Sequence, residues 1–152
     1  MNVSIIDFES NHKQAFKDLN YEWISKYFEV EDSDLKMLKD PQGYILDNGG
    51  AILIALSDQE ALGTCALIKM ENQVFELAKM AVSPKAQGKQ IGYKLGLATI
   101  EKAKKLGAKK LYLETNSVLK PAISLYRKLG FENACGYESP YSRCNVQMEM
   151  KL

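Results

Sequence analysis

The sequence predicts an α+β domain whose mixed, mostly antiparallel sheet carries helices on both faces. First, residues 51–56, 62–70 and 74–82 are apolar runs separated by short polar turns, a pattern typical of an antiparallel meander. Second, helical and extended patterns alternate after residue 90, which favours helices packed on a sheet. Third, the 152 residues, 46% of them hydrophobic, contain no repeat or linker, so we expect one domain over residues 1–152.

The first part of the chain predicts a strand, one or two helices and a turn. Residues 3–8 have the composition of a strand. Between residues 11 and 26, apolar side chains recur at steps of three and four, so they would share one face of a helix. A polar segment follows. Residues 40–43, Asp-Pro-Gln-Gly, are typical of a turn that leads into the meander.

The second part predicts two further helices and two strands. Residues 91–106 indicate a long helix that is mostly buried against the sheet, because its apolar positions cover a wide arc. A short strand over 111–115 follows, and then a helix over 121–129 that begins at a proline. A glycine comes directly after each helix and is suited to end it. Apolar and polar residues alternate over 146–152, which indicates a half-buried final strand.

The bulk composition excludes several classes of function. The net charge is +1, so no strong field attracts nucleic acid or anionic lipid. No apolar run is long enough to span a bilayer, and the first residues lack the basic and apolar regions of a secretory signal. Cys65, Cys135 and Cys144 have no metal-ligand spacing. We therefore expect a cytoplasmic protein with reduced thiols and no bound metal, although a Cys135–Cys144 disulfide stays open.

The stretch with the most specific chemistry leads from a strand into the long helix. The strand ends near Pro84, a turn containing Gly88 follows, and the helix begins near Ile91. Unpaired N–H groups at a helix N-terminus bind anions, and Lys85 and Lys89 add positive charge, so a pyrophosphate is the natural ligand. The turn has neither the Gly-Lys-Ser/Thr of a P-loop nor the Gly-x-Gly-x-x-Gly of a dinucleotide site, so we expect neither function.

This stretch resembles motif A of the GCN5-related N-acetyltransferase (GNAT) superfamily, Gln/Arg-x-x-Gly-x-Gly/Ala. Gln87 and Gly92 match the two ends of the motif, whereas Gln90 stands where the motif has glycine. A second block of the family is matched by Asn116 and by residues 121–131, which contain Leu-Tyr and Leu-Gly-Phe. The predicted order of strands and helices resembles the family over the whole chain.

The resemblance implies acetyl-coenzyme A (acetyl-CoA) as cosubstrate and the residues that hold it. In the family, the strand before the loop parts from its neighbour at a bulge, and the pantetheine arm pairs with the freed backbone groups, which here belong to Met80, Ala81 and Val82. The pyrophosphate then lies on the backbone of the loop, namely Gln87, Gly88, Lys89, Gln90, Ile91, Gly92 and Tyr93. Asn116 is expected either to hold cofactor or water through its amide or to be a plain turn residue.

The resemblance also implies catalytic and acceptor-binding residues. An amine is mostly protonated at neutral pH, so its acetylation benefits from a base. Glu76 matches the position of the glutamate base in histone-type members of the superfamily, although a plain surface carboxylate of the strand stays open. Tyr126 matches the usual general acid that protonates the departing thiolate. The acceptor is implied to lie between the first helices and the end of the chain, where Tyr27 and Arg143 are candidates. Arg143 could bind a substrate carboxylate.

The sequence therefore predicts an N-acetyltransferase that moves an acetyl group from acetyl-CoA to a primary amine of a small molecule, an amino acid or a peptide. It does not identify the amine, and a homodimer stays open. Two alternatives remain. One is a non-catalytic acyl-CoA-binding module of the same fold. The other is a structural or interaction protein in which the loop is only a turn.

Overall fold

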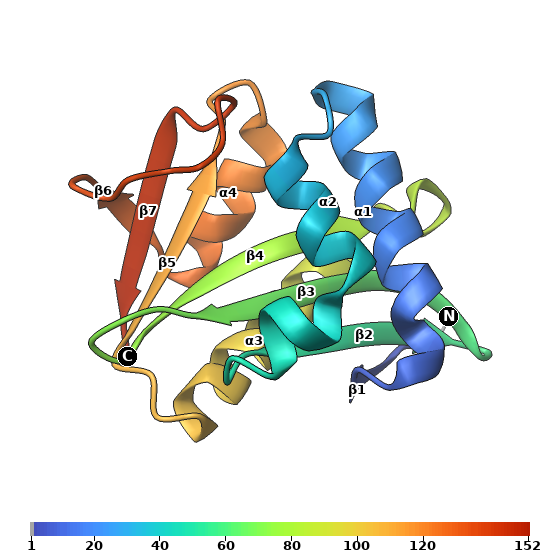
Figure 1. The fold of residues 1–152 in the computed structure, drawn as a ribbon. Coiled ribbons are helices and arrows are strands. Elements are labelled where there is room, and N and C mark those ends of the chain that lie inside the picture. Colours follow the sequence, from blue (N-terminus) through green and yellow to red (C-terminus); the bar gives the residue numbers. More distant parts are fainter. Residues whose placement is uncertain (1) are drawn as a thin grey trace.

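The computed structural model describes residues 2–152 and contains one seven-stranded sheet flanked by helices (Figure 1). The strands are β1 (Ser4–Asp7), β2 (Ala51–Ser57), β3 (Glu60–Lys69), β4 (Val74–Val82), β5 (Lys110–Thr115), β6 (Glu132–Ala134) and β7 (Val146–Lys151). The helices are α1 (Lys13–Tyr27), α2 (Asp32–Lys39), α3 (Ile91–Lys105) and α4 (Lys120–Leu129). The order across the sheet is β1-β2-β3-β4-β5-β7-β6, and β4–β5 is its parallel pair.

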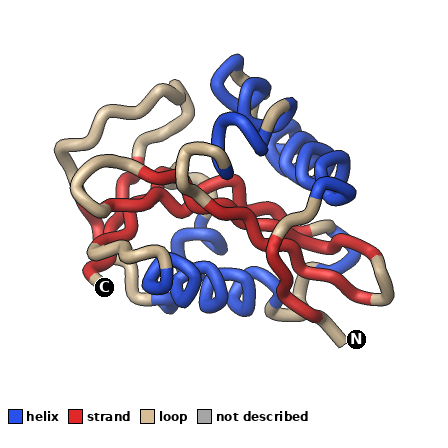
Figure 2. Tube along the Cα trace, turned by 60° about the horizontal axis from the view of Figure 1, so that its bottom comes forward, coloured by secondary structure: helices blue, strands red, loops and turns tan. Residues whose placement is uncertain are grey.

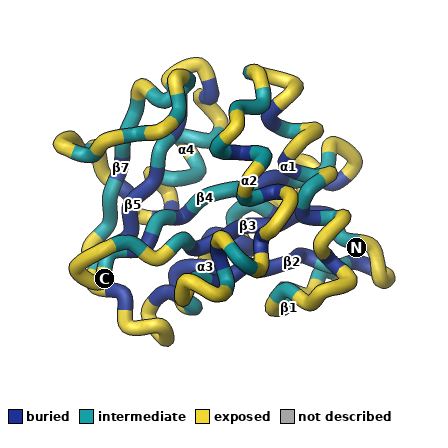
Figure 3. The backbone as a smooth tube through the Cα atoms, in the orientation of Figure 1, coloured by how far each residue is buried: buried dark blue, intermediate teal, exposed yellow. Residues whose placement is uncertain are grey.

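The sheet separates two hydrophobic cores. α1 and α2 lie on one face, and α3 and α4 lie on the other (Figures 1 and 2). The larger core, on the α3 side, includes Leu95, Leu111 and Met148, and the smaller core includes Phe16 and Leu38 under α1 and α2. The central strands are buried on both sides (Figure 3), which explains why β2 is a continuous apolar run rather than an alternating one. Within residues 2–152, no helix has the length and apolar character needed to cross a bilayer.

Most predicted elements are confirmed, and two local features differ. The meander, the helices on both faces and the final strand lie within a few residues of their predicted positions. The turn predicted at 40–43 is wrong, because Pro41 instead begins a helical turn over Gln42–Leu46. Asp40 Oδ1 accepts the N–H of Gly43 at 3.0 Å within that turn. β6 has no counterpart in the predicted order, since a strand of three residues carries too little alternation to recognise.

Candidate active site

β4 and β5 run side by side at one end only and then part. They pair over Val74–Glu76 and Lys110–Tyr112, and the rest of β5 pairs with β7 alone. Beyond this stretch, the edge of β4 that faces β5 has no ladder partner within the described sheet. Met80, Ala81 and Val82, the residues expected to hold the pantetheine arm, lie on the parted section.

A β-bulge lies in β4 close to the point where the strands part. The register of β3 against β4 shifts there, because Thr64 pairs with Ala81 whereas Ala66 pairs with Ala78. Two residues of β4 therefore oppose one of β3, and Lys79 has a φ of 52°. An inserted residue reverses the side of the sheet to which later side chains point.

The bulge turns the side chain of Lys79 toward the α1–α2 face of the sheet. Phe75 and Leu77 pack into the α3-side core before the bulge, and Met80 and Val82 pack against the same core after it. An unbroken period of two would point residue 79 into that core as well. Because of the bulge, Lys79 instead reaches the α1–α2 face, where its Nζ lies 2.5 Å from a carboxylate oxygen of α2.

The loop from β4 to α3 presents a row of backbone N–H groups. Gly88 has a φ of 81°, and Gln90, the N-cap of α3, has a φ of 59°. The first helical N–H with a backbone acceptor in the described chain belongs to Lys94, which donates to Gln90 O at 3.1 Å. The N–H groups of residues 88–93 therefore have no backbone acceptor within the described residues, and they lie at the positive end of the helix dipole, where an anion is favoured.

Two glutamines of the loop differ in their roles. The φ of Gln90 lies in the left-handed region, which glycine adopts without strain and other residues adopt at a cost of about 1 kcal/mol. Gln90 thus takes the conformation for which the motif glycine is suited. The N–H of Gln87 donates to Pro84 O at 3.4 Å, which narrows the expected anion-binding set to residues 88–93.

The first three residues of α3 have different surroundings. Ile91 is 1% exposed and belongs to the core. A Cβ on Gly92 would lie 3.3 Å from Leu125 of α4, so this glycine allows the two helices to approach closely. Lys128 Nζ lies 4.3 Å from the centroid of the Tyr93 ring, which adds a cation beside the start of α3.

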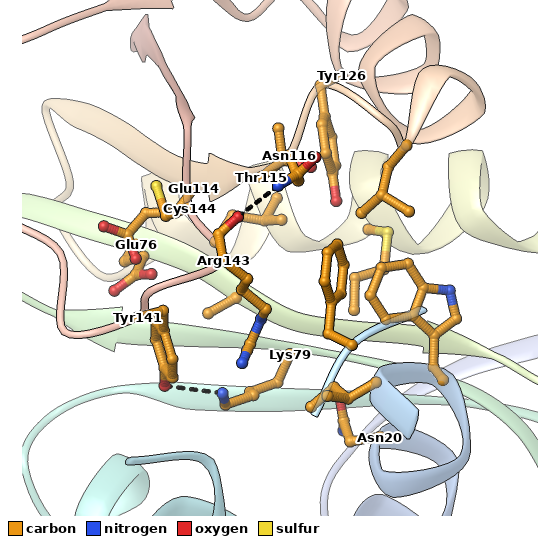
Figure 4. A pocket seen from close by; sticks show the side chains of 17 residues that line it. Asn20, Glu76, Lys79, Glu114, Thr115, Asn116, Tyr126, Tyr141, Arg143 and Cys144 are labelled. Carbon is orange, nitrogen blue, oxygen red and sulfur yellow. Dashed lines mark hydrogen bonds between the residues drawn. The ribbon is translucent and has the colours of Figure 1, made fainter. Parts of the chain in front are cut away.

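A pocket opens between α1, the parted strands, α4 and the segment before β7 (Figure 4). α1 and the residue after it contribute apolar side chains, among them Trp23 and Phe28. The other walls carry the polar groups that could do chemistry, namely Glu76, Lys79, Glu114, Tyr126, Tyr141 and Arg143. The pocket is thus bounded by one apolar wall and by a set of ionisable groups from four separate segments.

Glu76 lies on β4 at the last residue pair before the strands part. Its carboxyl group accepts no hydrogen bond from the described residues. Burial, and after it the negative charge of Glu114, raise the pKa of Glu76 to about 7, against the opposing charge of Lys79. A carboxyl group with this pKa gains and loses its proton near neutral pH, as a general base requires.

Tyr126, from α4, lies across the pocket from Glu76 and Glu114 (Figure 4). Its ring packs edge-to-face against Phe131, with 6.2 Å between the ring centroids. Its hydroxyl makes no hydrogen bond with the described residues, and burial raises the pKa of Tyr126 far above the usual value. The hydroxyl therefore stays protonated and can donate a hydrogen bond to a ligand in the pocket.

Arg143 makes a two-pronged contact with Asp34 of the same chain. Its Nη1 and Nη2 donate to Asp34 at 2.7 and 2.8 Å, and Nη1 also donates to Glu31 at 3.2 Å. Lys79 donates to the same Asp34 at 2.5 Å and to Tyr141 Oη at 2.9 Å. The guanidinium that the sequence suggested for a substrate carboxylate is thus already engaged by two carboxylates of the chain.

Of two other expected site residues, Asn116 is hydrogen-bonded within the chain, and Tyr27 does not line the pocket. Asn116 Nδ2 donates to Arg143 O at 2.7 Å, and Asn116 Oδ1 accepts the N–H of Val118 at 2.9 Å, so both ends of the amide are used within the chain. Tyr27 is 46% exposed and lies outside the set of residues that line the pocket. Trp23, whose ring centroid is 5.2 Å from that of Tyr27, lines the pocket instead.

Two polar pocket residues, Lys79 and Glu114, have no counterpart among the sequence predictions. Both leave a signal in the sequence. The apolar alternation of β4 changes phase between Leu77 and Met80, which indicates a bulge and an inward turn of the intervening lysine. Glu114 occupies a polar position of an alternating strand that neighbours the strand of the predicted base.

Comparison with known proteins gives relatives named for acetyl transfer. YjgM of Escherichia coli (strain K12), an uncharacterized N-acetyltransferase, is 44% identical over 71 residues, which cover 47% of this chain and 42% of the relative. YvbK of Bacillus subtilis (strain 168), also an uncharacterized N-acetyltransferase, is 38% identical over 101 residues, which cover 64% of this chain and 65% of the relative. The chain thus spans less than two thirds of either relative.

A solved structure extends the similarity to the whole chain. The structure of a Bacillus subtilis acetyltransferase in complex with CoA is 26% identical, with a TM-score of 0.73 over 99% of both chains. The model of the acetyltransferase (GNAT) family matches residues 17–131, which run from α1 to just beyond α4 and include the bulge, the loop and both candidate catalytic residues. This chain therefore belongs to the acetyltransferase (GNAT) family.

Proposed function

We propose that this protein is an N-acetyltransferase that moves an acetyl group from acetyl-CoA directly to the primary amine of a small molecule or peptide. The observation that carries the proposal is the junction of β4 and β5, which opens into a pocket with Glu76 on one wall and Tyr126 on another. The names of the relatives and the CoA complex of the Bacillus subtilis acetyltransferase support it.

The residues at the parted strands fit acetyl-CoA. The unpaired edge of β4 over residues 80–82 offers backbone N–H and C=O groups to the amides of the pantetheine arm. The N–H groups of residues 88–93 suit the pyrophosphate, and a Cβ built on Gly88 meets nothing within 4 Å, which leaves room for it. The exposed Lys89 adds positive charge. When bound there, acetyl-CoA supplies the activated thioester carbonyl.

Glu76 takes the proton of the incoming ammonium group, directly or through a water molecule. With a pKa of about 7, its carboxylate is present in a large fraction at neutral pH and yet basic enough to accept a proton. The neutral amine nitrogen then attacks the thioester carbonyl carbon. The new C–N bond forms, the C–S bond breaks, and the amine proton released in this step passes to solvent or to CoA.

Tyr126 stabilises the departing sulfur. Because burial raises the pKa of Tyr126, its hydroxyl is a weak acid and acts chiefly as a hydrogen-bond donor to the negative charge that develops on sulfur. The thiolate of CoA takes up the proton that the amine nitrogen releases, directly or through solvent. The products are the acetylated amine and free CoA, which contains a thiol that can be measured.

Binding of acetyl-CoA is tested by thermal unfolding. Millimolar acetyl-CoA should raise the melting temperature, since a ligand that binds only the folded state stabilises it. Lys89→Glu should reduce this shift, because it places a like charge beside the pyrophosphate. Lys105→Glu makes the same change of charge at the far end of α3 and should leave the shift intact. An unshifted melt of the unaltered protein would contradict the proposal.

Turnover distinguishes an enzyme from a binding module of the same fold. Release of the CoA thiol should depend on both acetyl-CoA and an amine. A module would show the melting shift without amine-dependent thiol release from any primary amine tested.

A further inference from the structure

The ion pairs of the pocket wall leave none of its cations free. Lys79 and Arg143 are the lysine and arginine that line the pocket, within the residues described. Both bind Asp34, and Arg143 also binds Glu31, so two positive charges meet two negative charges. Arg143 uses both of its terminal nitrogens in these contacts. This part of the wall is therefore close to electrically neutral.

Two further carboxyl groups of the pocket have no cationic partner of their own. Glu114 accepts the hydroxyl hydrogens of Tyr112, at 2.6 Å, and of Ser139, at 3.0 Å. Hydroxyl groups are neutral, so they orient the carboxylate of Glu114 without cancelling its charge, and each oxygen keeps a further lone pair. Glu76 accepts no hydrogen bond from the described residues. The uncompensated charge of the pocket is thus negative.

The two carboxyl groups lie close enough to influence each other. They project from neighbouring strands where β4 and β5 part, and Figure 4 shows them on the same side of the pocket. The charge of Glu114 contributes to the raised pKa of Glu76. A ligand cation between or beside them would relieve this repulsion. Elsewhere on the pocket wall, Trp23, Phe28 and Leu119 offer apolar surface to an alkyl chain.

We propose that the acceptor is a small aliphatic diamine, and that Glu114 selects it by binding the ammonium group that does not react. The inference rests on the proposed acetyl transfer, because Glu76 is then reserved for the reacting amine. A monoamine would leave Glu114 without a cation. The carboxylate of a zwitterionic acceptor would meet Glu114 and would find Arg143 already engaged, so the same pocket disfavours amino acids.

Three acceptors of similar length test the proposal: 1,4-diaminobutane, butylamine and 4-aminobutyrate. We expect kcat/KM, measured by thiol release at pH 8, to be about tenfold or more higher for the diamine than for butylamine, and lowest for 4-aminobutyrate, as a charge-assisted contact requires. Glu114→Gln keeps the shape and should remove the advantage of the diamine, and the readout is the ratio of kcat/KM for the diamine to that for butylamine, because any effect of the lost charge on Glu76 is common to both acceptors. Glu132→Gln, an exposed carboxylate of β6, is the matched control.

Each contrary outcome has a distinct meaning. Equal rates with diamine and monoamine, an equal loss with both in Glu114→Gln, or a preference for a lysine peptide over the diamine would overturn the inference and leave acetyl transfer intact. Absence of both thiol release and an acetyl-CoA melting shift would overturn the proposed function, and the inference with it. Calorimetry adds a readout without turnover, since 1,4-diaminobutane should bind the CoA-loaded protein and lose that binding in Glu114→Gln.

Discussion

Arg143 and Asp34 are 109 positions apart in the chain and share a two-pronged ion pair on the wall of the pocket. The side chain of Asp34 is 0% exposed and that of Arg143 is 18% exposed. Burial alone would raise the pKa of Asp34, but the hydrogen bond from Arg143 and the charge of Lys79 outweigh it and hold the pKa at about 2. The pair holds the segment before β7 against α2 beside the pocket.

Removal of the guanidinium should destabilise the fold. Arg143→Met keeps the apolar stem and leaves Asp34 buried with Lys79 as its remaining cationic partner. We expect the free energy of unfolding in urea to fall by about 2–3 kcal/mol, somewhat less than for a fully buried pair because Arg143 is partly exposed. Arg127→Met, on the exposed face of α4, should change it by about 0.5 kcal/mol or less. A similar loss of unfolding free energy in both variants would show that the Arg143–Asp34 ion pair does not stabilise the fold.

The strained glutamine of the loop offers a stabilising substitution. Gln90→Gly relieves a left-handed φ of 59°, so we expect the melting temperature to rise by a few degrees, which corresponds to about 1 kcal/mol. Gln87→Gly is a matched control, because Gln87 has an ordinary φ of −65° and glycine there only adds freedom to the unfolded chain. A lower melting temperature for Gln90→Gly would mean that the glutamine side chain supports the loop.

The fold was largely predictable because its signals are local. Apolar runs with polar turns, the wide apolar arc of α3 and the alternation of β7 each lie within one element. The departures are short or depend on context: Pro41 permits a turn or the start of a helix, and β6 is three residues long. The phase change in β4 was present in the sequence, but a lysine followed by apolar residues also occurs in ordinary strands.

Glu76 should carry a stability cost that disappears in acid. The folded protein raises its pKa from 4.5 to about 7, so the folded state holds the proton more tightly than the unfolded chain. Stability should therefore fall as the pH rises from about 4.5 to about 7 and stay lower above it. Glu76→Gln removes this cost, and we expect it to be about 3 kcal/mol more stable than the unaltered protein at pH 8, because each pKa unit corresponds to about 1.4 kcal/mol. In urea unfolding the difference should vanish at pH 4; a constant difference would contradict the raised pKa.

The same carboxyl group should set the pH dependence of turnover. As a base, Glu76 acts only when it is deprotonated, so kcat/KM should rise with pH and level off above about 7. Glu76→Gln should lower turnover and abolish this limb of the profile. A profile that keeps its limb in the variant would assign the ionisation to another group, with the Glu114 carboxyl group as the next to test.

Only the site residues that lie in family motifs or at known strand positions could be predicted from the sequence. Glu76 and Tyr126 were placed by resemblance, and the structure brings both to one pocket. The network around Arg143 depends on a contact between segments at opposite ends of the chain, which no local pattern reports. Asp34, in the first turn of α2, is the most buried partner of the site's cations, although it lies in a polar stretch of the sequence.

Tyr126→Phe separates catalysis from packing, because it removes one hydroxyl and little volume. The hydroxyl makes no hydrogen bond with the described residues, so the folded state should lose little stability. If the hydroxyl stabilises the departing sulfur, kcat should fall by about 10- to 100-fold, while the melting shift with acetyl-CoA is retained. Tyr44→Phe, on the exposed helical turn at 42–46, is the control and should keep full turnover. Unchanged kcat in Tyr126→Phe would assign the ring to packing against Phe131, and a lost melting shift would place the hydroxyl in cofactor binding instead of the chemical step.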